Sequence, residues 1–392
     1  MRALAAWIVL LVLVPGAQAG HDATDWSQAE AVPLVEDADA PANIAVADDG
    51  SVWYAEVYTG DLWRQSVDGA RERVRHVDVE AGGERGLVGF APAHDFQETG
   101  AYYLYYTAPD PEAENGTNRL VRVEDGGETL LATVPGAPEH NGGRILVDPE
   151  GDLFVSTGEN QLRDPAQDPG SLLGKILHMT PEGGPVEGGS GVVYSLGHRN
   201  VYGLALDPAT GQLWATENSG WRRDEVNRIE AGGNYGYPEC EGRGLNGVDT
   251  PCPTNKGYIF PVMSFYEDRT AAPTGAAFWK GGLYWASLRE GSIHHLWEEG
   301  GEWKDAIVHD TEGVLLDLHV GPLGHLHYAT MDGVYRIGFP GEPAPSYTGG
   351  SAPSGETFAP RGSAPPEEAP IPSSPWLVVG LALLALARRR RT

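Results

Sequence analysis

The sequence predicts an all-β fold, a six-bladed β-propeller of four-stranded antiparallel blades. One pattern, an apolar strand, a turn with Asp, Pro or Gly, and a second strand of alternating apolar residues, occurs six times between Ala45 and Met331. Alternation with period 2 after tight turns is typical of β-strands, and helical periodicity is nearly absent outside the two ends of the chain. The turn glycines of the six copies are Gly50, Gly100, Gly151, Gly211, Gly282 and Gly324.

A further short strand follows most copies of the pattern and completes the antiparallel units. These strands are GDLWRQ from Gly60, RLVRV from Arg119, GKILHM from Gly174, DEVNRIE from Asp224 and GVYRIG from Gly333. Each unit has two apolar faces and cannot fold alone, whereas radial stacking of six units buries both faces and protects the strand edges. A pair of β-sandwiches is the alternative, but it would not produce six turns at this spacing.

The N-terminal end predicts export. Residues 1–19 contain one arginine, an apolar run from Ala3 to Val14 and small residues at the end, which is the composition of a secretory signal peptide. The mature chain is therefore expected to begin near Gly20, and residues 20–340 are expected to form the propeller domain.

The C-terminal end predicts a tether. Residues 341–375 are rich in Pro, Ser, Gly and Glu and should form a disordered linker. Residues 376–392 hold an apolar run of 12 residues, Trp376 to Ala387, and a cluster of arginines. As a helix this run would be about 18 Å long, shorter than a hydrocarbon core of about 30 Å. The segment is therefore either a weak membrane anchor or a sorting signal, and both interpretations place the protein in an extracellular or periplasmic location, tethered at the cell surface.

The net charge of -28 argues against nucleic acid as a partner, because the phosphate backbone would be repelled. The chain has two cysteines, Cys240 and Cys252, in a loop rich in Asn, Gly and Pro. In an exported protein they predict one disulfide. A metal site is less consistent with the sequence, since no histidine or third cysteine stands at ligand spacing beside them.

Candidate catalytic groups precede the third and fourth copies of the strand pattern, where propellers expose loops at one end of the central channel. Glu139 and His140 lie in a loop flanked by glycines before the third copy. A histidine beside a carboxylate can act as a general base that the carboxylate tunes. An exposed turn histidine without a role is the alternative. Arg199 and Asn200 precede the fourth copy and offer donors for a carbonyl or carboxylate ligand.

The segment from Ser219 to Tyr235 combines acidic residues with a Gly turn. Carboxylate and main-chain carbonyl oxygens are the hard ligands that calcium selects. Taken alone this segment is a weak indication of a calcium site, since acidic turns are abundant in the chain.

Six segments together carry a resemblance to a known family: ERGLVGFAPAHDF, EHNGGRILVDPEGDLFVSTGE, LLGKILHMTPEG, LGHRNVYGLALDPATGQLWATE, DEVNRIEAGGNYGYP and APTGAAF. In this order they resemble the soluble glucose and aldose sugar dehydrogenases, also called the glucose/sorbosone dehydrogenase family. The resemblance extends from Pro41 to Ile337.

The resemblance implies a propeller that binds pyrroloquinoline quinone (PQQ) over its central channel, with calcium bridging cofactor and protein. His140 would take the proton from the C1 hydroxyl of an aldose while hydride passes to the quinone, which yields the lactone. Glu139 would orient and tune His140, and Arg199 would polarise the quinone oxygen. The implied partners are a small-molecule sugar and an external electron acceptor, and the protein would contact a membrane only through its C-terminal tail.

The resemblance also assigns binding residues. The cofactor contacts are Arg199, Asn200, Thr270 and Arg289, the last standing where the family has Lys. The substrate contact is Glu84, where the glucose enzymes have Gln. The calcium ligands are Ser219 and Gly220 for the cofactor's ion, and Glu225 and Tyr235 for a second, structural ion.

The chain departs from the family where a basic pair is expected. It has Val314 and Leu316, so two cationic contacts to the cofactor's carboxylates are missing, at a cost of about 1.5 to 3 kcal/mol each. Arg222, Arg223 or His319 could supply replacement charge. The main alternative function is a non-catalytic surface propeller that binds glycan or protein, as the Hedgehog-interacting protein does. A calcium-dependent lactone or ester hydrolase is a third hypothesis.

Overall fold

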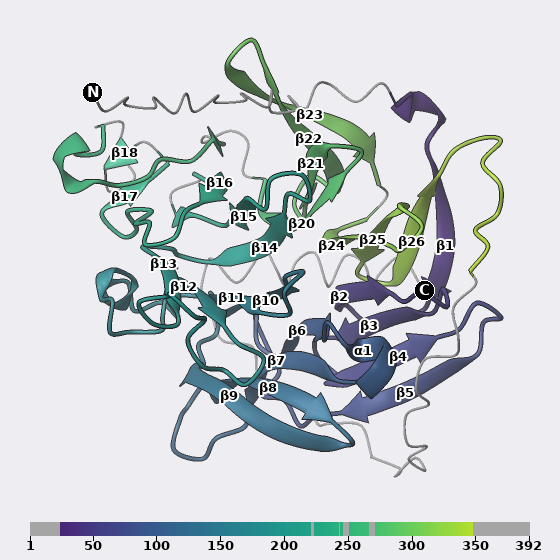
Figure 1. The fold of residues 1–392 in the computed structure, drawn as a ribbon, viewed down its shortest axis with the longest axis horizontal. Coiled ribbons are helices and arrows are strands. Elements are labelled where there is room, and N and C mark those ends of the chain that lie inside the picture. Colours follow the sequence, from purple (N-terminus) through teal and green to yellow (C-terminus); the bar gives the residue numbers. More distant parts are fainter. Residues whose placement is uncertain are drawn as a thin grey trace, which may run out of the picture.

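The computed structural model describes residues 24–220, 223–242, 244–245, 251–265, 271–311 and 313–347. In this part of the chain, six four-stranded antiparallel sheets are arranged radially around a central axis (Figure 1). The predicted six-bladed propeller is therefore confirmed. The predicted signal peptide and C-terminal anchor, and most of the predicted linker, lie outside the described residues.

The chain builds each blade from the axis outwards. Blade 1 comprises β2 (Pro41–Val46), β3 (Val52–Glu56), β4 (Asp61–Gln65) and β5 (Arg71–His76). Blade 2 comprises β6 (Leu87–Pro92), β7 (Tyr102–Ala108), β8 (Thr117–Glu124) and β9 (Gly127–Pro135). Blade 3 comprises β10 (Gly142–Val147), β11 (Leu153–Thr157), β12 (Lys175–Met179) and β13 (Val193–Leu196).

Blades 4 and 5 follow the same plan, and in blade 6 the outermost strand comes from the N-terminal end of the domain. Blade 4 comprises β14 (Val201–Leu206), β15 (Leu213–Glu217), β16 (Glu225–Ile229) and β19 (Met263–Ser264). Blade 5 comprises β20 (Pro273–Trp279), β21 (Gly282–Ser287), β22 (Ser292–Glu299) and β23 (Glu302–Asp310). Blade 6 comprises β24 (Leu315–Val320), β25 (Leu326–Thr330), β26 (Gly333–Gly338) and β1 (Glu30–Glu36).

The remaining elements are short. The described residues contain one α-helix, α1 (Phe96–Thr99), between β6 and β7. The 3-10 turns are η1 (Trp26–Gln28), η2 (Asp164–Gln167) and η4 (Thr254–Lys256), and a two-stranded sheet pairs β17 (Cys240–Glu241) with β18 (Gly244–Leu245). The predicted disulfide between Cys240 and Cys252 is confirmed.

The N-terminal strand closes the ring. β1 is the outermost strand of blade 6 and pairs antiparallel with β26, from Glu30 opposite Gly338 to Glu36 opposite Gly333. In Figure 1 the purple β1 lies beside the yellow-green β26. Because the two ends of the domain share one sheet, the first and last blades are joined and their strand edges are paired. This strand is not among those predicted from the sequence, because it lies before the first copy of the repeated pattern.

Five of the six predicted turn glycines have a positive φ: Gly50, Gly100, Gly151, Gly211 and Gly324. In blade 5 the prediction was one residue too late. Gly281 takes the left-handed conformation, with a φ of 82°, and Gly282 begins β21. The predicted further strands are β4, β8, β12, β16 and β26.

Apolar side chains fill the spaces between neighbouring blades. Trp53 of β3 lies edge-on to Phe96 of α1, with ring centroids 5.1 Å apart, and is stacked on Phe90 of β6 at 6.2 Å. Leu62 and Leu104 of the same cluster are fully buried. These contacts hold blade 1 against blade 2, and each further pair of blades has a similar interface.

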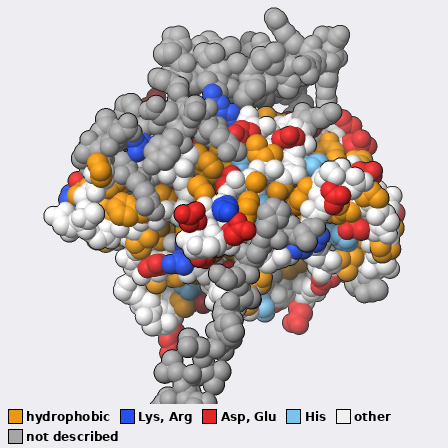
Figure 2. Space-filling model, turned by 90° about the horizontal axis from the view of Figure 1, so that it is seen from above, with side chains coloured by type: hydrophobic (Ala, Val, Ile, Leu, Met, Phe, Trp, Pro, Cys, Tyr) orange, Lys and Arg blue, Asp and Glu red, His pale blue; other side chains and the backbone are white. Residues whose placement is uncertain are grey.

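Acidic side chains are common on the face of the molecule drawn in Figure 2. Asp and Glu side chains are spread over this face, with Lys and Arg at scattered places, in agreement with the net charge of -28. Within the ranges that the structure describes, no helix has the length and apolar character needed to cross a membrane.

The inner strands β2, β6, β10, β14, β20 and β24 contact one another in a closed ring. The third residue of each inner strand lies where neighbouring strands meet at the axis. In β6, β14 and β20 this residue is a glycine, namely Gly89, Gly203 and Gly275. A Cβ on Gly89 would lie 2.1 Å from the carbonyl oxygen of Gly143, and one on Gly203 would lie 2.3 Å from that of Thr274. Glycine is therefore needed for neighbouring inner strands to approach this closely.

The third residues of the other inner strands, Asn43, Arg144 and Asp317, form a polar cluster at the axis. Nη1 of Arg144 is 3.3 Å from Oδ1 of Asp317. Oδ2 of Asp317 accepts two hydrogen bonds, one from Nδ2 of Asn43 over 3.2 Å and one from the N–H of Ile44 over 3.0 Å. The guanidinium also donates to the main-chain carbonyls of residues 42, 202 and 316, at 2.5, 2.5 and 2.6 Å. One arginine therefore joins blades 1, 3, 4 and 6.

Replacing Arg144 by Met should destabilise the protein by about 3 to 5 kcal/mol, because Asp317 would remain buried without its cation. Urea unfolding at pH 7 measures the change. The control is Arg228→Met, since the side chain of Arg228 is 52% exposed and its loss should leave the unfolding midpoint almost unchanged. Similar midpoints for the two variants would contradict an axis held together by Arg144.

Candidate active site

The loops that enter the inner strands place functional groups at one end of the axis. His140 stands two residues before β10 and Arg199 two residues before β14, so they occupy equivalent positions in consecutive blades. Because β10 and β14 are in contact, the side chains meet, and Nη2 of Arg199 lies 2.9 Å from Nε2 of His140. The structure thus brings together the residues that precede the third and fourth repeats.

The contact with Arg199 fixes the tautomer of His140. A guanidinium is always charged and can only donate hydrogen bonds. Nε2 of His140 must therefore carry a lone pair that accepts from Arg199. The ring proton lies on Nδ1, which donates to Oε1 of Glu159 over 2.6 Å. His140 is consequently a neutral imidazole whose unprotonated nitrogen is Nε2.

The main chain of His140 is held in an uncommon conformation. Its φ is 62°, in the left-handed region that residues other than glycine rarely adopt. Its N–H donates to Oε2 of Glu84 over 2.7 Å, and its carbonyl accepts the N–H of Asn160 over 3.1 Å. A Cβ on Gly158 would lie 1.6 Å from that carbonyl oxygen, so only glycine fits there. These neighbours fix the position of the imidazole.

The carboxylate that orients the imidazole of His140 is Glu159, which the sequence analysis did not identify. The predicted partner, Glu139, is 38% exposed and its Oε2 is 3.8 Å from Nε2, whereas the side chain of Glu159 is 1% exposed. Burial acts to raise the pKa of Glu159. Hydrogen bonds from His140 and from the N–H of Arg163, with the charge of Arg199, outweigh burial and lower this pKa. Glu159 is therefore ionised beside the imidazole.

A buried chain of hydrogen bonds, the relay formed by Ser195, His198 and Glu217, holds the main chain of Arg199. Its N–H donates to Oε1 of Glu217 over 2.5 Å, and Oε2 of Glu217 lies 2.9 Å from Nδ1 of His198. Nε2 of His198 is 2.8 Å from Oγ of Ser195. All three relay residues are at most 2% exposed, so they position Arg199 without meeting a substrate. The guanidinium is also fixed, because Nη1 donates to the carbonyl of Asn218 over 2.8 Å.

Glu84 and Asn200 line the side of the site that adjoins blade 2. Oε2 of Glu84 accepts Nδ2 of Asn200 over 3.1 Å, in addition to the N–H of His140. Oδ1 of Asn200 accepts the N–H of Gly142 over 3.1 Å. Asn200 is 1% exposed and its amide is engaged by these partners, so its contact with the cofactor stays a prediction. Glu84 is half-buried beside His140, a position compatible with its predicted contact to substrate.

Arg289 lies at the same end of the axis. It stands in the loop between β21 and β22 with its side chain exposed, and its N–H donates to the carbonyl of Ala271 over 3.3 Å. Ala271 stands two residues before β20, which is the position that His140 occupies relative to β10. Thr270, the remaining predicted cofactor contact, lies outside the described residues.

Among the candidates for replacing the missing basic pair, His319 lies away from the candidate active site. His319 is near the far end of β24, with its ring centroid 6.4 Å from that of His327. Arg223 is 2% exposed. Arg222 lies outside the described residues. Leu316 occupies one of the two positions where the family has the basic pair, and its main-chain carbonyl accepts a hydrogen bond from the guanidinium of Arg144.

Ser219 and Gly220, the predicted ligands of the cofactor's calcium, follow β15 at the same end of the axis. The N–H of Ser219 donates to Oδ1 of Asp224 over 3.2 Å. The carbonyl of Gly220 accepts the N–H of Arg223 over 3.2 Å, and such an oxygen keeps a second lone pair. A Cβ on Gly220 would lie 3.0 Å from both carboxylate oxygens of Glu241, so this acid adjoins the predicted ligands.

Glu225, a predicted ligand of the second calcium, is surrounded by other acids. Burial, and then the charges of Glu217 and Glu241, raise the pKa of Glu225 well above its usual range. Burial raises the pKa of Glu241 to about 7. Oε2 of Glu241 and Oδ1 of Asn227 are buried and have no hydrogen-bond partner among the described residues. Unsatisfied buried oxygens are costly, and a bound cation of the calcium type would satisfy them.

Tyr235 can contribute to this site only through its main chain. Its hydroxyl donates to the carbonyl of Arg228 over 2.7 Å and accepts the N–H of Glu230 over 2.9 Å. Neither Glu241 nor Asn227 is among the ligands predicted from the sequence. Asn227 lies two residues from Glu225 and on the same strand, which is a detectable spacing, whereas Glu241 is brought close by the loop that the disulfide closes.

The comparisons with known proteins agree with this geometry. The family model described as Glucose / Sorbosone dehydrogenase matches residues 38–333. The chain is 30% identical over 286 residues to the aldose sugar dehydrogenase YliI of Escherichia coli (strain K12), and the alignment covers 64% of this chain and 76% of that protein.

Two solved structures are similar over most of the propeller. The PQQ-bound form of the aldose sugar dehydrogenase of Streptomyces coelicolor has 29% identity and a TM-score of 0.68, covering 79% of this chain and 98% of its own. A putative oxidoreductase (glucose dehydrogenase) of Thermus thermophilus has 32% identity and a TM-score of 0.69, covering 79% of this chain and 99% of its own.

The lowered pKa of Glu159 predicts a pH-dependent contribution to stability. Since the folded-state pKa lies below the ordinary 4.5, ionised Glu159 stabilises the fold fully above about pH 4.5, and the contribution is lost as the pH falls through the folded-state pKa. Glu159→Gln should therefore lower the urea midpoint at pH 7 and lower it less at acidic pH. Glu139→Gln is the control, with little change at either pH. A deficit of Glu159→Gln that does not shrink on acidification would contradict this interpretation.

Proposed function

The chain belongs to the glucose/sorbosone dehydrogenase family, and we propose that it oxidises the C1 hydroxyl of an aldose to the lactone with PQQ and calcium, using His140 as the general base. The observation that carries this proposal is the neutral imidazole of His140, which Glu159 holds with its lone pair on Nε2. The PQQ-bound form of a relative supports the choice of cofactor.

His140 accepts the proton of the sugar hydroxyl at Nε2. A hydroxyl that reaches this nitrogen takes the place of the hydrogen bond from Arg199. The imidazolium that forms is stabilised by ionised Glu159, which already accepts Nδ1–H. The charge of Arg199 opposes protonation of the ring, so the carboxylate is needed to make His140 an effective base.

The residues present fit a cofactor with carbonyl and carboxylate oxygens. Arg199 and Arg289 are the charged donors that hold PQQ, and Arg199 keeps further N–H groups beyond those given to His140 and Asn218. When bound, PQQ supplies the acceptor for the hydride that leaves C1 of the sugar. The enzyme then needs an external electron acceptor to complete its cycle. Glu84, beside the main chain of His140, contacts the sugar.

Calcium fits the acidic groups behind Arg199. The main-chain carbonyls of Ser219 and Gly220 serve the cofactor's ion, and Glu225 with the carbonyl of Tyr235 serves the second ion. The buried oxygens of Glu241 and Asn227 that lack hydrogen bonds support a cation near Glu225. The charge of such an ion would remove the repulsion between the buried carboxylates.

The protein is proposed to act outside the cytoplasm, tethered at the cell surface by its C-terminal segment. The disulfide between Cys240 and Cys252 supports an oxidising compartment. Protease treatment of intact cells should release or degrade the protein, and protection until the cells are lysed would contradict this location.

Addition of PQQ, calcium and glucose or another aldose should bleach a redox dye, and His140→Ala should reduce the rate by about 100-fold to 10,000-fold, since it removes the general base. PQQ binding, followed by calorimetry, should persist in this variant. The control is His94→Ala, an exposed histidine in blade 2, which should keep full activity. No bleaching and no uptake of PQQ by the wild-type protein would favour the non-catalytic surface propeller.

Removal of calcium should lower the thermal unfolding midpoint of the wild-type protein, because a ligand at 100 times its dissociation constant stabilises the folded state by about 2.7 kcal/mol. Glu225→Gln should lose most of this dependence on calcium, whereas Glu187→Gln, at an exposed position, should keep it. Equal calcium-dependent shifts in the two variants would show that Glu225 is not a ligand.

A further inference from the structure

A cross-strand pair that recurs in the blades differs in blade 3. In blades 1, 2 and 4 an aromatic residue of the second strand lies opposite an arginine of the third. These pairs are Trp53 with Arg64, Tyr103 with Arg122, and Trp214 with Arg228. In blade 3 the pair is Phe154 with His178. Blade 5 also has a histidine at this position, with Tyr284 opposite His295. Blades 3 and 5 therefore have a histidine where three other blades have a permanent cation.

In blades 1 and 2 these arginines face a carboxylate from the connection between the first two strands. Arg64 lies 2.8 Å from Asp49, and Arg122 lies 3.9 Å from Asp95. The connection between β10 and β11 in blade 3 contains two aspartates, Asp148 and Asp152. Two acids in blade 3 thus share one histidine in place of an arginine.

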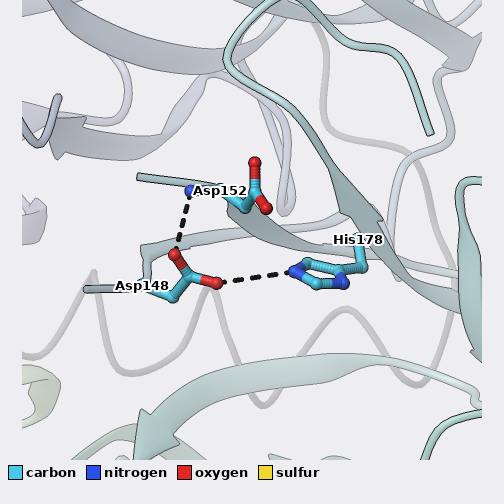
Figure 3. Close-up of side chains that lie close together, drawn as sticks. All are labelled: Asp148, Asp152 and His178. Atoms are coloured by element: carbon cyan, nitrogen blue, oxygen red, sulfur yellow. Dashed lines mark hydrogen bonds and ion pairs between the residues drawn. The ribbon is translucent and has the colours of Figure 1, made fainter. Parts of the chain in front are cut away.

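Asp148, Asp152 and His178 lie close together, and the carboxylate of Asp148 is directed at the ring of His178 (Figure 3). One ligand atom from each lies within 4.8 Å of the others. Oδ2 of Asp148 is 3.5 Å from Nε2 of His178, and this nitrogen is buried and makes no hydrogen bond. A protonated Nε2 would be expected to donate to the carboxylate at a shorter distance. The arrangement therefore leaves a ring nitrogen with no partner, directed at a carboxylate.

Two of the three side chains are held in place by their neighbours. The ring of His178 is stacked on Phe154, with centroids 4.1 Å apart, and lies edge-on to Tyr194 at 5.5 Å. Oδ1 of Asp148 accepts two main-chain N–H groups of its own turn, over 3.0 and 2.9 Å. Burial and the charge of Asp148 raise the pKa of Asp152, as expected for two acids without a permanent cation.

We propose that Asp148, Asp152 and His178 bind a first-row divalent cation such as Zn²⁺. One imidazole nitrogen and two carboxylate oxygens suit this ion. Bonds of about 2.0 to 2.2 Å in a tetrahedral site place the ligand atoms roughly 3.3 to 3.6 Å apart. The 3.5 Å between Asp148 and His178 already matches this separation. Asp152 is partly exposed in the turn and completes the set by rotating its side chain, with water as the fourth ligand.

This site is distinct from the candidate active site. It lies at the far end of β10 from His140, and the six residues of the strand span about 20 Å at roughly 3.3 Å per residue. A cation there would join the turn between β10 and β11 to β12. It would therefore clamp the far end of blade 3, whatever reaction the opposite end performs.

Calorimetric titration of the intact protein with zinc chloride, with calcium in excess, tests the site. Asp152→Asn and His178→Arg should each weaken zinc binding by at least about 100-fold, since each removes a ligand. His178→Arg installs the residue found in blades 1, 2 and 4, so it should fold. The matched control is Asp207→Asn in the equivalent turn of blade 4, where Thr210 donates to the carboxylate over 2.6 Å. This control should bind zinc as the wild type does.

Zinc should also raise the thermal unfolding midpoint of the wild type and of Asp207→Asn, but not of the two ligand variants. Absence of zinc uptake by the wild type, or uptake that both ligand variants retain in full, would overturn the proposal. Neither measurement involves sugar oxidation, so failure of the proposed function would not affect the result.

Discussion

The geometry of the propeller depends on the compensation of one buried charge. The guanidinium of Arg144 lies at the axis, bound to Asp317 and to main-chain carbonyls of three other inner strands. A buried arginine that lost these acceptors would be strongly destabilising, so the inner strands stay where they can supply them. Glycines at the same level of β6, β14 and β20 allow the strands to approach. Contacts at the axis thus hold the six inner strands in place, and the pairing of β1 with β26 closes the ring at the outer edge of blade 6.

Fixed inner strands determine where the loops before them meet. His140 and Arg199 approach each other because β10 and β14 are held side by side. The arginine then dictates the tautomer of the histidine, since a guanidinium only donates. Glu159 completes the arrangement from the opposite side of the ring and Glu84 from the main chain. A base, its orienting acid and a cation for developing charge are therefore assembled by four loops at one end of the axis.

Local patterns were enough to predict the blades, because turn glycines and strand alternation can be recognised within short stretches of consecutive residues. The partners of His140 were harder to predict. Glu139 is adjacent in the sequence, but the imidazole of His140, on a left-handed backbone, is directed to Glu159, which lies 19 residues away. β1 was missed because its role depends on pairing with β26 at the other end of the domain. Glu241 was missed for a similar reason, since no spacing relates it to Glu225.

The central claim concerns one nitrogen atom, Nε2 of His140. A nitrogen-15 NMR spectrum of the histidine side chains at neutral pH tests it, with the signals of His140 assigned by their disappearance in His140→Gln. A neutral ring with its proton on Nδ1 and a bare Nε2 is expected. A ring protonated on Nε2, alone or together with Nδ1, would contradict a base held between Glu159 and Arg199.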